Sequence, residues 1–311
     1  MTAYMAGTGH AASHWAGKQG DAPPKSVTEV MAKYRSWCAE GNPLFTKAET
    51  RRVRDLLNQR PGRGQMIPIQ GIDGVTVNFE IRTGDIWPGD NDAEELLFQN
   101  PHIAFIMPSK FEEILTGDDP DFHEAYCTIQ IEHDLVRRSR HTKQRLDEYD
   151  LPEQDDMIEY FFDIMADWQN SVTQECLKGI LSQCRIPQQI SKLLGFACGS
   201  ICDDTGYDER QAYQNAFLLA LKAELDLLED QQGPSTCYAQ DPDYTDRDKA
   251  TLQTLGIRVL DSPSALLEID ESSLVYACCA GFPIKQITRD FGRPAMLVWD
   301  RVRRTEEKRP K

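Results

Sequence analysis

The strongest constraint on the fold is an alternation of short apolar runs with helical stretches in the C-terminal half of the chain. Parallel strands need long crossover connections, which are usually helices, so this alternation predicts an α/β fold with a parallel sheet. The apolar runs are residues 193–198, 236–239, 258–260, 274–278 and 295–299. The helical stretches are residues 209–228, 246–255 and 284–291, with a shorter turn at 263–267.

A long helical stretch precedes this half of the chain. From residue 152 to residue 184, apolar side chains return at spacings of three and four, which is the period of an amphipathic helix. The pattern predicts one helix, within a connecting segment of residues 151–190, that joins the two halves. Its apolar face consists of Met157, Phe161, Ile164, Trp168 and Val172.

The N-terminal region, residues 26–150, is predicted to be a smaller α+β fold. Ser26 and Thr46 each begin a capping box, SVTE and TKAE, and such a box marks the start of a helix. Further along the region, alternating apolar residues predict short strands that form a small sheet. The strand candidates are residues 66–70, 75–81, 103–107 and 126–131.

The ends of the chain and its charge limit the kinds of partner. Residues 1–25 lack periodicity and predict a flexible leader, and residues 303–311 form a basic tail behind the sheet region of residues 191–302. The net charge of −16 repels phosphate, so we expect neither nucleic acid nor a membrane as a partner. Without a signal sequence or an apolar run of about 20 residues, a cytoplasmic protein with reduced cysteines is expected.

Four segments of the C-terminal half together carry a resemblance to a known family. They are LLGFACGSI at 193–201, QAYQNAFLLAL at 211–221, the run from CYAQDPDY to LVYACC at 237–279, and PIKQITRDFGRPAMLVWDRV at 283–302. This combination resembles the SRR-like family, named for sensitivity to red light reduced, and in particular its fungal members. The resemblance implies a Rossmann-like domain and, in plant members, an association with clock and light signalling. It implies no particular reaction.

Two positions depart from the pattern that the resemblance implies. The family often has a histidine after the glutamine that corresponds to Gln214, and another near the fourth strand. This chain has Asn215 and the pair Cys278 and Cys279 at those places. A role that depends on those histidines, heme ligation included, is therefore not expected here.

The loops after the strands are the candidate site, because ligands of an open parallel sheet bind beyond the carboxyl ends of its strands. In the first loop, Gly199 and Ser200 are placed to bring backbone N–H groups to a polar ligand, although the GxGxxG and Walker patterns are absent. In the second loop, Asp241 either meets a ligand hydroxyl or shapes the turn with Thr245 before the next helix. Tyr244 adds an apolar wall with a polar tip.

Cysteines and acidic residues suggest a catalytic cysteine–histidine pair and a diphosphate-magnesium site, but the sequence supports both less well. Cys278 and Cys279 would need a histidine from another part of the chain to form a catalytic pair, and small buried apolar side chains are the favoured interpretation. Asp155, Asp156 and Glu159 have the diphosphate-magnesium spacing of terpene synthases. Carboxylates in the first turn of a helix also complement its dipole, and this explanation is favoured.

These features favour a cofactor-independent enzyme with a pocket for an apolar, polyene or terpenoid-like molecule at the strand ends. It would act as a cyclase, isomerase or pericyclase of fungal specialised metabolism, without a metal, by holding a reactive conformation beside a few polar groups. The alternative is a non-enzymatic regulatory or interaction protein of the SRR-like family. The expected catalytic residues are Ser200, Gln214, Asp241 and Tyr244, and the expected substrate-binding residues are Phe196, Tyr207, Gln240, Cys278, Cys279, Phe282 and Trp299.

Overall fold

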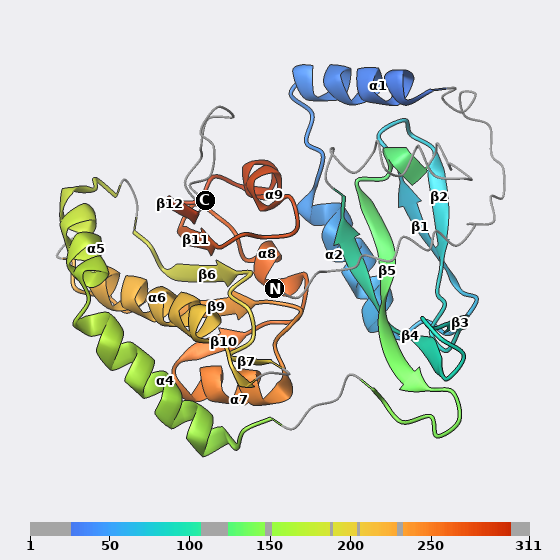
Figure 1. The fold of residues 1–311 in the computed structure, drawn as a ribbon. Helices are drawn as coiled ribbons and strands as arrows, with labels where there is room; N and C mark the ends of the chain where they lie inside the picture. Colours follow the sequence, from blue (N-terminus) through green and yellow to red (C-terminus); the bar gives the residue numbers. More distant parts are fainter. Residues whose placement is uncertain are drawn as a thin grey trace. The chain divides into compact units, whose positions relative to one another are not determined.

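The structure is a computed structural model that describes residues 26–106, 124–146, 151–186, 189–203, 206–228 and 233–299. The chain divides into two compact units, Met1–Leu146 and Asp147–Lys311, which Figure 1 shows in blue to green and in green to red. The predicted flexible leader and basic tail lie outside the described residues.

The first unit combines two helices with two small antiparallel sheets. Ser26 and Thr46 cap the helices as predicted, since each side chain accepts a hydrogen bond from the backbone N–H three residues further on. The strands pair as β1-β2 and β3-β4-β5. The elements are α1 (Val27–Ala39), α2 (Lys47–Asn58), β1 (Met66–Gln70), β2 (Thr76–Glu80), β3 (Ile86–Pro88), β4 (Glu94–Phe105), the 3₁₀ helix η2 (Glu124–Tyr126) and β5 (Ile129–Ser139).

Strands β4 and β5 are much longer than the sequence pattern predicts. Their registers run from Glu94 opposite Ser139 to Phe105 opposite Ile129, with an irregularity between Gln99 and Pro101. This irregularity interrupts the alternation of apolar and polar residues on which strand prediction depends. The predicted runs therefore cover only one end of each strand.

His133 on β5 makes the stability of the first unit depend on pH. Its half-buried ring accepts a hydrogen bond at Nε2 from the backbone N–H of Arg82, at 3.0 Å. Burial, and then the nearby charges of His102 and Arg82, lowers the pKa of His133 from 6.5 to about 4. An unfolded chain takes up this proton near pH 6.5, but the folded chain does not until pH 4, so the free energy of unfolding falls as the pH is lowered between these values.

We expect the free energy of unfolding to fall by about 1–2 kcal/mol between pH 6.5 and pH 4, after allowance for the partial exposure of the His133 ring. Urea unfolding of the wild-type protein and of His133→Gln at several pH values measures it. The variant should lose this part of the pH dependence, whereas His141→Gln, which changes an exposed ring in a turn, should keep it. An equal pH dependence of the free energy of unfolding in wild type and His133→Gln would contradict this role of His133.

The second unit contains the predicted parallel sheet. Its five strands are all parallel and lie in the order β10-β9-β6-β11-β12, so the α/β prediction is confirmed. The strands are β6 (Lys192–Phe196), β9 (Thr236–Gln240), β10 (Ile257–Val259), β11 (Ser273–Ala277) and β12 (Met296–Trp299), with a short hairpin of β7 (Cys202–Asp203) and β8 (Gly206–Tyr207). The helices between them are α6 (Glu209–Asp226), α7 (Asp246–Thr254), α8 (Ser264–Leu267) and α9 (Ile284–Phe291).

The helices cover both faces of this sheet. Figure 1 shows α6 and α7 on one face of the strands and α8 and α9 on the other. Helix α6 lies especially close, because a Cβ added at Gly195 in β6 would be 2.6 Å from Cδ2 of Leu218. Burial on both faces explains why all five residues of β11 are buried and why its sequence has no polar alternation. None of the helices in the described parts of the chain is long and apolar enough to cross a membrane.

The prediction of one connecting helix over residues 152–184 is wrong. The segment forms two helices, α4 (Gln154–Gln169) and α5 (Val172–Gln183). Ser171 separates them, because its hydroxyl oxygen accepts the N–H of Gln174 and starts a new helix, while its O–H donates to the carbonyl of Trp168. The predicted apolar face of α4 is buried in the same core as the sheet, but Val172 is 79% exposed. Both helices belong to the second unit.

Candidate functional site at the carboxyl ends of the strands

The strand order places a topological switch point beside the first strand of the sheet. After β6 the chain moves to β9 and then β10 on one side, and β11 and β12 lie on the other side. In this arrangement, ligands bind in the crevice where the connections diverge, beyond the carboxyl ends of the strands. Phe196 at the end of β6 lies opposite Ala277 of β11 and Gln240 of β9. The loops that follow these strands therefore begin side by side.

The backbone is unusual in the two loops that flank the switch point. Ala197 and Gly199, directly after β6, have φ values of 55° and 71°, and Cys279, after β11, has φ of 50°. Residues other than glycine rarely adopt this left-handed conformation, and each such residue costs on the order of 1 kcal/mol. A Cβ added at Gly199 would also lie 1.5 Å from Oε1 of Gln211. Surrounding contacts therefore hold both loops in conformations that their residues do not favour.

Ser200 is part of a buried hydrogen-bond network centred on Asp248. Its hydroxyl donates to Oδ2 of Asp248 at 2.7 Å, and the residue is only 6% exposed. Asp248, which the sequence did not single out, is completely buried and also accepts the N–H of Ile201 and both the N–H and the O–H of Thr245. This network attaches the loop after β6 to the start of α7. It also confirms that Thr245 caps that helix.

Tyr244 and Asn215 form a second buried attachment of the same loop. The hydroxyl of Tyr244 donates to Oδ1 of Asn215 at 2.7 Å, and Nδ2 of Asn215 donates to the carbonyls of Gly199 and Gln211. Burial raises the pKa of Tyr244 well above its usual value, so this phenol stays protonated as a donor. The neighbouring Gln214 is half-buried, and its carboxamide has no hydrogen-bond partner among the described residues.

Asp241 uses only part of its hydrogen-bonding capacity. Its two carboxylate oxygens accept the backbone N–H groups of Gly199 at 2.8 Å and Asp243 at 2.9 Å. Burial raises the pKa of Asp241, and these two hydrogen bonds partly oppose the increase. A carboxylate accepts up to about four hydrogen bonds, so each oxygen keeps a free position. Gln240, in contrast, is buried and accepts the N–H of Ala265, which positions α8.

The predicted apolar residues divide between the switch point and other places. Phe196 is completely buried, and half-buried Phe282 lies edge-on to it with ring centroids 6.3 Å apart. Trp299 lies at the end of the edge strand β12, where Nζ of Lys285 is 4.6 Å from the ring centroid. Tyr207 is 39% exposed and stacks on a ring of α4. In the remaining pair, Cys278 is half-buried and Cys279 exposed.

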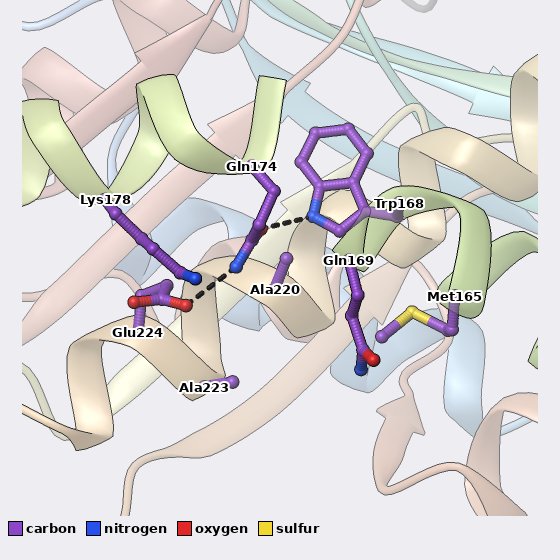
Figure 2. A pocket seen from close by; sticks show the side chains of 8 residues that line it. All are labelled: Met165, Trp168, Gln169, Gln174, Lys178, Ala220, Ala223 and Glu224. Carbon is purple, nitrogen blue, oxygen red and sulfur yellow. Dashed lines mark hydrogen bonds between the residues drawn. The ribbon is translucent and has the colours of Figure 1, made fainter. Parts of the chain in front are cut away.

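A cavity of about 300 Å³ lies elsewhere in the second unit, between α4, α5 and α6. Figure 2 shows it from close by. None of the residues predicted for the site lines this cavity. Its lining consists of Met165, Trp168, Gln169, Gln174, Lys178, Ala220, Ala223 and Glu224.

Comparison with family models matches the sheet region to a known domain. The family model of the SRR1 domain matches residues 176–311, which include every strand of the parallel sheet and both loops at the switch point. No curated protein and no solved structure matches the chain. The match confirms the resemblance to SRR-like domains that the sequence motifs carry, without bearing on the fungal type. The C-terminal part of the chain, residues 176–311, is therefore an SRR1 domain.

Proposed function

We propose that the SRR1 domain of this protein binds a small, largely apolar molecule at the switch point of its sheet. The left-handed backbone at Ala197 and Cys279, in adjoining loops, carries the proposal. Strained backbone is retained mainly where function requires a particular shape, and the crevice between diverging strands is where open parallel sheets bind ligands. The ligand would lie between residues 197–200 and residues 278–282.

The side chains around the switch point suit a ligand with an apolar body and one polar end. Phe282, supported by Phe196, offers an aromatic surface that is only half covered. Asp241 offers a carboxylate with unused acceptor positions, and its burial raises its pKa. A polyene or terpenoid-like molecule, as in fungal specialised metabolism, has this chemistry.

A chemical step at this site would be a cyclisation, isomerisation or pericyclic reaction without a cofactor. The loops would hold a reactive conformation of the substrate, and Asp241 would give or accept a proton or a hydrogen bond. Ser200 and Tyr244 would act by holding the loop, since their hydroxyl groups already donate to Asp248 and Asn215. In a regulatory protein, the alternative within the same family, the ligand would bind and leave unchanged.

Ligand binding is expected to stabilise the second unit against unfolding. At a concentration one hundred times the Kd, the increase is about 2.7 kcal/mol. Thermal unfolding and native mass spectrometry, with a panel of polyene and terpenoid compounds, measure it. Phe282→Ala should weaken binding, because it removes the half-buried aromatic ring beside the switch point, whereas Phe162→Ala, which removes an aromatic ring 59% exposed on α4, should not.

Product analysis of the same mixtures separates the two forms of the proposal. An enzyme converts the bound compound, and Asp241→Asn should then bind it but convert it much more slowly. Binding without conversion by the wild-type protein would support the regulatory alternative. If no compound stabilises the protein, or if Phe162→Ala weakens binding as much as Phe282→Ala, the switch point is not the site.

A further inference from the structure

The cavity between α4, α5 and α6 has a polar side and an apolar side, as Figure 2 shows. It shares no residue with the switch point. Helix α4 precedes the part of the chain that matches the SRR1 domain, whereas α6 lies inside it. The cavity is thus formed jointly by the family domain and by the helix that this chain places in front of it.

A chain of hydrogen bonds holds a carboxylate at the polar side. The indole N–H of Trp168 donates to Oε1 of Gln174 at 2.6 Å, and Nε2 of Gln174 donates to Oε1 of Glu224 at 2.7 Å. Gln174 is only 6% exposed, so its orientation is well defined. Among the described residues, Gln174 is the hydrogen-bond partner of Glu224, which leaves most of the acceptor capacity of this carboxylate for a ligand.

A lysine on the facing helix supplies the opposite charge. Lys178 lies one turn along α5 from Gln174, and Figure 2 shows Lys178 and Glu224 approaching Gln174 from α5 and α6. Within the described structure, Lys178 pairs with Glu175 at 3.2 Å and not with Glu224. Both members of that pair are exposed, so the pair contributes little and is easily exchanged for another partner.

The remaining surfaces of the cavity are apolar or small. Ala220 and Ala223 on α6 form a floor without long side chains, and Met165 and Trp168 on α4 form an adjacent wall. A flat ring and a flexible thioether contact many shapes of apolar group. The cavity therefore offers an acceptor for a cation, a donor for an anion, and a surface for an apolar group.

We infer that this cavity binds a free α-amino acid. The ammonium group would donate to Glu224, the carboxylate would accept from Lys178, and the side chain would lie over Ala220 and Ala223 against Met165. Opposite charges on facing helices, unpaired with each other, match the two charges of one small zwitterion. A ligand with a single charge would leave either the carboxylate or the ammonium of the protein unmatched.

Isothermal titration of the full-length protein with the common free amino acids tests the inference. At least one should bind with saturation at one site, and its N-acetyl and methyl ester forms, which each lack one charge, should bind much more weakly. Removal of one charged partner typically weakens such binding by about tenfold or more. We expect this loss for both Glu224→Gln and Lys178→Gln. The matched control is Glu209→Gln, which changes an exposed carboxylate at the other end of α6.

Three results would overturn the inference. They are no saturable binding of any free amino acid up to millimolar concentration, equal binding of the N-acetyl form, and unchanged affinity in both cavity variants. If the Glu224→Gln variant does not fold, the affinity of Lys178→Gln decides whether the inference holds. The Lys178 side chain is half exposed and far less important for packing. Tryptophan fluorescence provides an independent readout, and replacing Trp168 by phenylalanine should abolish the signal change on binding.

Discussion

Replacing Asp248 by alanine is expected to lower the free energy of unfolding of the second unit by about 3 kcal/mol or more. The carboxylate is completely buried and accepts hydrogen bonds from Ser200, from Ile201 and twice from Thr245. Alanine would leave two backbone N–H groups without their acceptor in the protein interior. Buried donors without an acceptor are among the most costly defects in a folded chain.

Urea unfolding followed by hydrogen exchange measures this loss in the second unit alone. Exchange should accelerate at Ile201 and Thr245 first, because their N–H groups lose a partner directly. Asp246→Ala is the matched control, since Asp246 lies in the same helical turn but its side chain is fully exposed. We expect a change within about 0.5 kcal/mol for this variant. Similar losses for the two variants would contradict the importance of the buried network.

Replacing Asn215 by alanine should destabilise the same unit by about 2–4 kcal/mol. The side chain is completely buried, holds the carbonyls of Gly199 and Gln211, and accepts the hydroxyl of Tyr244. Its loss releases the strained loop after β6 as well as the hydrogen bonds. We therefore also expect weaker binding of any ligand of the switch point, because the unbound loop would adopt other conformations.

A double-mutant cycle separates the contribution of Tyr244 from that of the rest of Asn215. Tyr244→Phe alone should cost about 1–2 kcal/mol, and much of this cost should disappear when Asn215 is already alanine. Gln214→Ala serves as the control, since this half-buried neighbour has no hydrogen-bond partner in the described structure. Strictly additive effects of Asn215→Ala and Tyr244→Phe would show that their 2.7 Å hydrogen bond is energetically unimportant.

The parallel sheet was predictable because its strands are buried on both faces. Continuous apolar runs such as the one at Leu274 leave a clear signal, and turn and helix signals bound them. The prediction of a single helix over residues 152–184 was wrong because helical spacing continues across Ser171, although this serine caps a new helix. A serine cap inside a periodic stretch is difficult to distinguish from an ordinary surface serine.

The sequence predicted the location of the candidate site better than it predicted the roles of the individual residues. The rule for strand ends selected Ser200, Asp241 and Tyr244, and the structure brings all three to the loops around β6 and β9. The partners that take up their hydrogen bonds, Asp248 and Asn215, lie on helices that follow in sequence. A TxxD capping signal marks Asp248, but nothing in the sequence indicates that a serine 48 residues earlier donates to it.

Helix α4, in front of the family match, and α5, which crosses its first residue, also determine where the folding unit begins. Met157 and Phe161 on α4 are completely buried in the same core as Leu193 and Leu218, which lie within the matched region. A fragment cut at residue 176, where the family match begins, would divide α5 after its first turn and uncover the outer surface of α6. A piece of this protein that keeps this core complete therefore starts ahead of α4, outside the family boundaries.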